Sequence, residues 1–447
     1  MTAYTMATST PDATPTATAV QADSLVHTLA TALATPPSGP ADTRELAGRE
    51  QSLDRGTAGI ALLHVERALT GTGSWSTAHA WIRAATACDI SAADDTGLYL
   101  GAPAIAFLLH AANSDNIDHA GRYHKALSTL DAHVEALAHR RVDAATARLD
   151  RGESTSFADY DVIRGLTGIG RLLLYRAPAA CMSQANALSR VLRYLIRLTH
   201  PRSDGRPGWW VDHHPDPALP TPGGHANHGL AHGIAGVLAF LGTALRRGVT
   251  VDGHHDAIAT LGAHLDHWQQ DNPSQTTPNP AGPLRRNWWP TWITHDDIHT
   301  GHPLQPGPPR PSWCYGTPGI VRALQIAAIA TGDTARQRRA EHVLVGCISD
   351  SHQLAHLSDV GLCHGWAGLY QTVWRAAQDA TTSDLPHHLP NLTTQLTRQA
   401  SQYVSRPTTR PGDPTFLTGT AGLALALHTA THNTAPRSGW DACLLIN

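Results

Sequence analysis

The sequence lacks any run of apolar residues long and clean enough to cross a membrane. Residues 1–22 are rich in Thr, Ala and Pro, lack the basic start and apolar core of a signal peptide, and are expected to form a disordered tail. Neither sign of charge dominates, since 33 Lys and Arg stand against 36 Asp and Glu, and no basic stripe suggests nucleic acid as a partner. The six cysteines lie far apart, so a reduced, cytoplasmic setting fits better than a disulfide framework.

The sequence does contain an internal repeat, marked by pairs of glycines three residues apart. A run rich in Leu, Ala, Ile and Val follows each pair, and such nearly all-apolar runs are typical of buried helices. A seventh copy keeps the first glycine and replaces the second by alanine (Gly101 and Ala104). The six complete pairs are Gly56/Gly59, Gly165/Gly168, Gly233/Gly236, Gly316/Gly319, Gly365/Gly368 and Gly419/Gly422. We expect these glycines to permit sharp turns and close helix packing.

The stretches between these runs mix apolar and polar residues at helical spacing, which predicts outer helices with one solvated face. They are 23–35, 75–92, 122–145, 183–200, 253–272, 335–355 and 385–404. Seven buried helices alternating with seven amphipathic ones predict an all-α fold, a closed α/α toroid or double barrel. A chain of 447 residues could hold two or three average domains, but the repeats run to the C-terminus, so we predict one toroid over 23–447.

Two cysteines occupy the same position in neighbouring repeats, each two residues before the first glycine. They are Cys314 and Cys363, and His364 follows the second. If the repeats are related by rotation about an axis, both thiols point at one spot and the imidazole lies beside them. Two thiolates and one imidazole suit zinc and leave its fourth position open for a substrate, so we predict one zinc per chain. The cysteines at 88, 181, 347 and 443 are expected to pack in the core.

Two long stretches, 201–229 and 273–311, interrupt the helical rhythm and carry five tryptophans: Trp209, Trp210, Trp288, Trp289 and Trp292. Loops this long inside a compact domain are usually functional. We expect small irregular or β insertions near the cysteines, which form either a wall of a peptide cleft or a structural cap.

Four segments together resemble the lanthionine synthetase C-like family, which contains the cyclases of class I lanthipeptide (lantibiotic) biosynthesis. They are HGLAHGIAG (228–236), SWCYGTPG (312–319), CHGWAG (363–368) and FLTGTAG (416–422). The resemblance covers the whole repeat region and implies the α/α toroid independently of the periodicity. Because no kinase-like or dehydratase region precedes the toroid, the chain resembles the stand-alone cyclase.

The resemblance implies roles for individual residues. Cys314, Cys363 and His364 match the zinc ligands of the family, and His232 matches its catalytic histidine. Asp161, Arg310 and Tyr315 match further active-site residues. From the residues alone, Asp161 could equally cap the helix turn that follows it, and Arg310 could be a solvated charge in a proline-rich loop. Among 29 histidines, His232 stands out because it occupies the same repeat position as His364.

The activity implied by the resemblance is intramolecular addition of peptide cysteine thiolates to dehydroalanine or dehydrobutyrine, which forms (methyl)lanthionine thioether rings. The substrate would be a dehydrated precursor peptide, leader plus core. The resemblance leaves open whether a dehydratase and an ABC transporter join the protein in a complex at the membrane. Two rival hypotheses remain: a zinc-dependent thiol-alkylating enzyme such as a protein prenyltransferase, for which we find no basic cluster near the turns, and a non-catalytic, zinc-stabilised peptide-binding scaffold.

Overall fold

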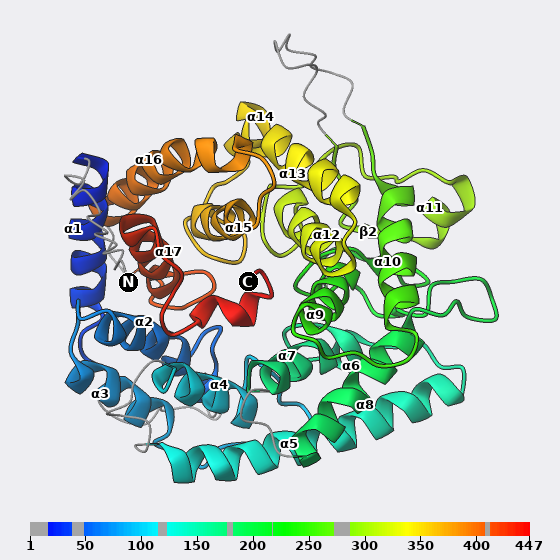
Figure 1. Ribbon diagram of the computed structural model, residues 1–447, viewed down its shortest axis with the longest axis horizontal. Helices are drawn as coiled ribbons and strands as arrows, with labels where there is room; N and C mark the ends of the chain where they lie inside the picture. The colour runs from blue at the N-terminus through cyan, green and yellow to red at the C-terminus, as the bar shows by residue number, and fades with distance from the viewer. Residues whose placement is uncertain are drawn as a thin grey trace, which may run out of the picture.

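Two concentric rings of helices form the protein, as Figure 1 shows down the shortest axis of the molecule. The computed structural model describes residues 17–37, 49–114, 123–176, 182–216, 218–271, 287–406 and 412–447. The predicted all-α toroid is confirmed, with seven inner and seven outer helices in these described ranges. No helix in them combines the length and the apolar character needed to span a membrane.

The inner helices follow the glycine pairs and are buried over most of their length. They are α2 (Thr57–Leu69), α4 (Ala102–Ala112), α7 (Leu166–Arg176), α9 (Ile234–Arg246), α12 (Thr317–Thr331), α15 (Trp366–Gln378) and α17 (Thr420–His432). The outer helices are α1 (Ala17–Ala32), α3 (Trp75–Ala85), α5 (His124–Asp150), α8 (Met182–Leu198), α10 (His254–Trp268), α13 (Thr334–Ile348) and α16 (Asp384–Ser405). Short helices lie between them: η1 (Arg49–Gln51), α6 (Phe157–Tyr160), α11 (His295–Thr300), α14 (Ser351–Ala355) and η3 (Trp440–Leu444).

Several helix ends differ from the sequence-based expectation: α5 runs to Asp150, 335–355 divides into α13 and α14, and α1 and α3 also differ. Helix α1 begins at Ala17, so the predicted end of the tail at residue 22 is wrong; Ala22 and Val26 are buried and hold this end of the helix on the toroid. Residues 1–16 lie outside the described residues. Helix α3 ends at Ala85 and not at residue 92, which leaves Cys88 exposed in a turn, so its predicted core packing is wrong. Cys347 and Cys443 are buried as expected, and Cys181 lies outside the described residues.

The second glycine of each pair lies at a close backbone contact. A Cβ atom there would lie only 1.8 to 2.3 Å from the carbonyl oxygen of the residue six positions earlier, at Gly59, Gly168, Gly236, Gly319, Gly368 and Gly422. A close approach is therefore present, but it is to the loop before each helix and not, as expected, to another helix. The expected need for a sharp turn at the first glycine holds only at Gly101, where φ is +71°; Gly316 and Gly365, for example, have extended backbones with φ of −91° and −115°.

A closed ring of backbone hydrogen bonds joins the loops before the inner helices. Each link connects residues two or three positions before the first glycine of neighbouring repeats, and the last repeat bonds to the first. The links are Leu53 N–H to Tyr99 O, Tyr99 to Ile163, Val162 to Ala231, Ala231 to Cys314, Cys314 to Cys363, Cys363 to Leu417 and Leu417 to Asp54, at 2.8 to 3.5 Å. The ring brings the residues before all seven inner helices to the same end of the barrel.

The C-terminal segment lies inside the inner ring (Figure 1). Two buried side chains bind it: the indole of Trp313, in the loop before α12, donates to the carbonyl of Leu444 at 2.8 Å, and Arg322 Nε of α12 donates to the carbonyl of Ile446 at 2.7 Å. Asp441 is fully buried and accepts two hydrogen bonds from Arg375 at 2.6 and 2.7 Å. The centre of the toroid is therefore filled by the chain itself.

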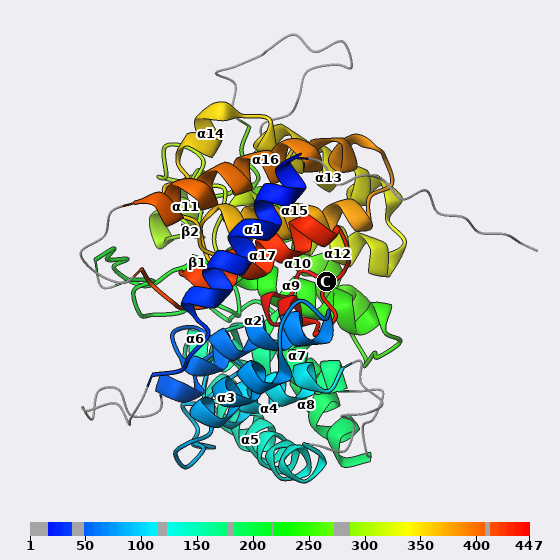
Figure 2. The same cartoon turned by 90° about the vertical axis from the view of Figure 1, so that its left-hand side faces the viewer.

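The two insertions meet in a small two-stranded sheet. Strand β1 (Ala226–Asn227) pairs antiparallel with β2 (Trp292–Ile293), with Ala226 opposite Ile293. Figure 2 shows both strands and α11 toward one side of the toroid, away from the C-terminus. Trp209, Trp210, Trp288 and Trp289 are buried beneath the sheet region, so these four act as the core of a structural cap. Residues 217 and 272–286 lie outside the described residues.

Candidate metal centre and active site

Cys314, Cys363 and His364 come together at one end of the barrel. Their ligand atoms all lie within 4.8 Å of one another, and theirs is the cluster of metal-ligating side chains found among the described residues. The backbone ring sets this meeting, because the Cys314 N–H donates to the carbonyl of Cys363 at 3.2 Å. The repeat thus places the three side chains as the sequence suggested, while their role as ligands stays a prediction.

The donor set concentrates negative charge at a buried point. The Cys363 thiol donates toward Cys314 and, with His364 beside it, holds the pKa of Cys314 well below its usual range despite burial. The same contact raises the pKa of Cys363, and the Cys314 sulfur raises the pKa of His364. A divalent cation would let both thiols ionise together. Two soft sulfurs and one imidazole are ligands that zinc favours, so the residues fit that metal.

His232 and Asp161 form a hydrogen-bonded pair, with Nδ1 of the imidazole 2.5 Å from Oδ2 of the carboxylate. Asp161 is buried, and its Oδ1 accepts the backbone N–H groups of Arg164 and Gly165, each at 2.7 Å. Asp161 therefore caps the turn before α7, as one of the two alternatives held, and it also binds an imidazole, while its active-site role stays a prediction. Burial lowers the pKa of His232, but the carboxylate of Asp161 outweighs it, so the pKa is raised above 6.5.

Two aromatic rings enclose the His232 imidazole. Phe157, the first residue of α6, stacks on it with a centroid distance of 5.1 Å and an interplanar angle of 24°. The Tyr315 ring lies at 6.0 Å with an angle of 32°. Tyr315 follows Cys314 directly, so the histidine of one repeat is held beside the cysteine of the next. No pattern in the sequence pointed to Phe157, because α6 belongs to none of the repeated helices.

A cleft of about 320 Å³ opens beside Cys314 and Tyr315. The two insertions supply most of its other walls. They contribute Pro215, Asp216 and Leu219 from 201–229, and Thr291, Trp292, Pro309 and Arg310 from 273–311. Leu219 is 51% exposed, which leaves an apolar rim at the mouth. The insertions are therefore both a cap, through their four buried tryptophans, and a cleft wall, through Trp292.

Asp359 was not identified from the sequence, although it contacts two of the expected site residues. Its Oδ2 lies 3.3 Å from Nε2 of His364 and 3.7 Å from Nη1 of Arg310. Asp359 stands six residues before Gly365, and Asp413 stands six residues before Gly419. Extending the repeat alignment by these few residues would have shown a carboxylate recurring at this position.

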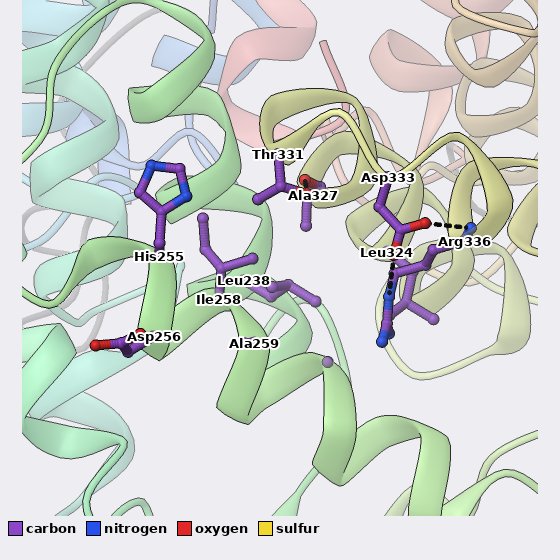
Figure 3. A pocket seen from close by; sticks show the side chains of 11 residues that line it. Leu238, His255, Asp256, Ile258, Ala259, Leu324, Ala327, Thr331, Asp333 and Arg336 are labelled. Atoms are coloured by element: carbon purple, nitrogen blue, oxygen red, sulfur yellow. Dashed lines mark hydrogen bonds and ion pairs between the residues drawn. The ribbon is translucent and has the colours of Figure 1, made fainter.

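A different cavity, of about 390 Å³, lies in the wall of the toroid between α9, α10, α12 and α13. Figure 3 shows its lining, with Leu238, Ile258 and Leu324 beside the ion-paired Asp333 and Arg336. No thiol lines this cavity, and the only imidazole in its lining, His255, belongs to no metal-ligating cluster of the described residues. The chemistry of the chain therefore gathers at the cysteine cleft and not at this wall.

Comparisons with known proteins agree with the fold and with the motifs. The family model for "lanthionine synthetase C-like protein" matches residues 49–445. The nisin biosynthesis protein NisC of Lactococcus lactis subsp. lactis is 24% identical over 281 residues, which span 61% of this chain and 60% of that protein. A solved nisin cyclase structure superposes with a TM-score of 0.73 at 18% identity and covers 96% of this chain and 97% of that one. Since the family model spans most of the chain, the protein belongs to the lanthionine synthetase C-like family.

Proposed function

We propose that this protein is a zinc-dependent lanthipeptide cyclase, which joins peptide cysteines to dehydroalanine or dehydrobutyrine in thioether rings. One observation carries the proposal: Cys314, which clusters with Cys363 and His364, lines the same cleft as Tyr315, and Tyr315 adjoins a histidine held by a buried aspartate. A thiol-activating centre and a proton donor are the two functions that this addition requires. Family membership and the names of the two relatives, one a nisin biosynthesis protein and one a nisin cyclase, support the same reaction.

The three ligands would hold zinc with a position left open for substrate. The metal would supply Lewis acidity that ionises the peptide thiol, whose reference pKa is about 8.5. The peptide thiolate then forms a bond from sulfur to the β-carbon of the dehydro residue, and the displaced electron pair moves onto the carbonyl as an enolate. Protonation at the α-carbon completes the addition and balances the proton lost from the thiol.

In this proposal His232 gives that proton. Asp161 binds Nδ1, which fixes the ring and favours its charged form, so Nε2 is the nitrogen that donates. Phe157 and Tyr315 restrict the tilt of the ring from its two sides. In the cleft, the Arg310 guanidinium would hold the enolate oxygen, since it remains charged and donates in a fixed fork.

The substrate in this proposal is a dehydrated precursor peptide, leader plus core. An open cleft walled by two insertions accommodates a long flexible chain better than a sealed pocket does. The proposal includes a cytoplasmic location and a complex at the membrane with a dehydratase and an ABC transporter. Co-purification of tagged protein with such partners tests that extension separately from the chemistry.

The reaction is tested with purified protein and a dehydrated, cysteine-containing peptide. Thiol alkylation followed by mass spectrometry counts the cysteines that remain free, and a sample without enzyme corrects for spontaneous ring closure. Loss of free thiols that depends on the protein supports the proposal. Tight peptide binding without ring formation would instead indicate a scaffold, and transfer of a prenyl group from its diphosphate would indicate the other rival.

A further inference from the structure

The loop before Gly365 is organised around the carboxylate of Asp359. One oxygen, Oδ1, accepts the N–H of Gly361 at 3.0 Å, and the Asp359 carbonyl accepts the N–H of Trp366 at 3.2 Å. The other oxygen, Oδ2, faces His364 Nε2 at 3.3 Å and Arg310 Nη1 at 3.7 Å. A Cβ atom on Gly365 would lie 2.2 Å from Oδ1, so the glycine is what allows the carboxylate to approach.

The next repeat contains the same arrangement without any site residue. Asp413 Oδ1 accepts the N–H of Thr415 at 3.0 Å, and its carbonyl accepts the N–H of Thr420 at 2.7 Å. Its Oδ2 accepts the hydroxyl of Thr418 at 2.6 Å. Thr418 precedes Gly419 just as His364 precedes Gly365. In both repeats one oxygen therefore supports the loop, while the other holds the side chain immediately before the glycine.

This comparison separates the two functions of Asp359. Its Oδ1 supports the loop, as Oδ1 of Asp413 does in the next repeat. Because Asp413 contacts no expected site residue, loop support alone does not explain why Asp359 contacts His364 and Arg310. Its Oδ2 contacts a predicted metal ligand and a predicted cleft residue that come from different repeats. Arg310 itself stands six residues before Gly316, the same offset at which Asp359 precedes Gly365. Neighbouring repeats thus meet through these two side chains.

We infer that Asp359 is a positioning residue that aligns His364 for the metal and Arg310 for the cleft; this inference rests on the proposed function. In this inference the carboxylate, whose Oδ2 lies 3.3 Å from Nε2 of His364, takes the Nε2–H and leaves Nδ1 as the nitrogen for the metal. Imidazoles that bind metals generally donate their other N–H to such a carboxylate, which fixes the tautomer and the ring orientation. The same oxygen attracts the guanidinium of Arg310, which belongs to the preceding repeat.

The test measures zinc affinity in the full chain by competition with a chromophoric chelator. Asp359→Asn should weaken zinc binding about 10- to 100-fold, the usual effect of removing such a partner. Asp413→Asn is the matched control, because it changes the same loop-supporting carboxylate one repeat away, and its zinc affinity should equal that of the wild type. Circular dichroism confirms that the helix content of both variants is intact.

Asp359→Ser provides a second variant in case the first folds poorly. A serine hydroxyl can still accept the Gly361 N–H, as in other short turns, but supplies no second oxygen for His364 or Arg310. Its zinc affinity should fall as far as that of Asp359→Asn. At saturating zinc, both variants should remain slower in cyclisation than Asp413→Asn, because Arg310 has lost its partner.

The outcomes distinguish the inference from the function on which it rests. If both Asp359 variants bound zinc with wild-type affinity, the positioning function would be overturned. The proposed function would still stand if the wild-type protein bound one zinc per chain. Equal weakening in Asp359→Asn and Asp413→Asn would show that only loop structure is affected, and would also overturn it. A wild-type protein that binds no zinc would remove the proposed function itself.

Discussion

At the scale of single residues, the site depends on side chains that each make contacts of two kinds. Asp161 caps a turn with one oxygen and binds His232 with the other, and Asp359 supports a loop while contacting His364. In both cases the local structural function fixes the carboxylate, so its second oxygen is held in place. The resemblance to the family pointed to Asp161 but not to Asp359, and the residues alone could not separate the two functions, because a capping aspartate and an orienting aspartate look alike in a single chain.

His232→Ala should keep zinc and bind the dehydrated peptide, yet cyclise it about 10²- to 10⁴-fold more slowly, the usual contribution of a general acid or base. The expectation follows because the imidazole is bound by Asp161 and lies outside the metal-ligating cluster. Single-turnover ring formation, corrected for spontaneous closure, measures it. If the variant lost its zinc, the residue would be a ligand and the open coordination position would be wrong.

The pH dependence of cyclisation should differ between wild type and Asp161→Asn. Burial lowers the pKa of His232 and Asp161 outweighs it, so the charged donor persists above pH 6.5 in the wild type. The rate should therefore hold near neutral pH and fall as pH rises through the folded-state pKa. With the carboxylate removed, the fall should move to lower pH. An identical alkaline limb in the two proteins would exclude this pair as the proton donor.

The raised pKa of His232 also makes the free energy of unfolding depend on pH. Because the folded-state pKa of His232 is above its unfolded value, the pair stabilises the protein fully below about pH 6.5. That contribution is lost as pH rises through the folded-state pKa. Urea unfolding of Asp161→Asn should show a smaller deficit at high pH than at pH 6. A deficit that did not change with pH would assign the carboxylate to turn capping alone.

At the scale of elements, the glycine pairs act through close contact more than through unusual backbone angles. The sequence predicted a close approach at these glycines, but between helices. It did not predict that the contact is with the carbonyl oxygen six residues earlier. Helix ends were less predictable, as α1 and α3 show, because buried side chains such as Ala22 extend a helix beyond its compositional limits.

Gly422→Ala should lower the free energy of unfolding by about 1–3 kcal/mol, the usual range for overpacking. The added methyl group would lie 2.0 Å from the Phe416 carbonyl oxygen and 2.8 Å from a Leu362 methyl group. Gly307→Ala is the control, because nothing lies within 4 Å of its added Cβ, and its effect should stay within about 0.5 kcal/mol. Similar unfolding curves for the two variants would mean that the contact relaxes without cost.

At the scale of the whole molecule, a backbone ring at one end and the C-terminal segment inside hold the toroid together. The periodic sequence indicated a closed barrel. From that closure it followed that the two cysteines, which occupy the same position in neighbouring repeats, would meet in space. The segment after α17 has no repeat pattern, so its place inside the ring could not be predicted. Long-range contacts, such as the hydrogen bond from Trp313 to Leu444, determine where this segment lies.

Asp441→Ala should lower the free energy of unfolding by about 3–5 kcal/mol, because it removes a fully buried carboxylate and leaves the largely buried Arg375 guanidinium without that partner. Asp150→Ala, which removes an ion pair with Arg197 on the surface, should change it by less than about 1 kcal/mol. Urea denaturation followed by tryptophan fluorescence compares the two. Equal effects would show that the C-terminal segment contributes no more than a surface contact.

The metal content of purified Cys363→Ala tests the central claim most directly, because Cys363 is one of the three ligands and the toroid has a large core of its own. Wild type should contain one zinc per chain, and the variant should contain almost none while its circular dichroism keeps the helical signal. A full zinc complement in folded Cys363→Ala would contradict the ligand assignment and the proposed chemistry with it.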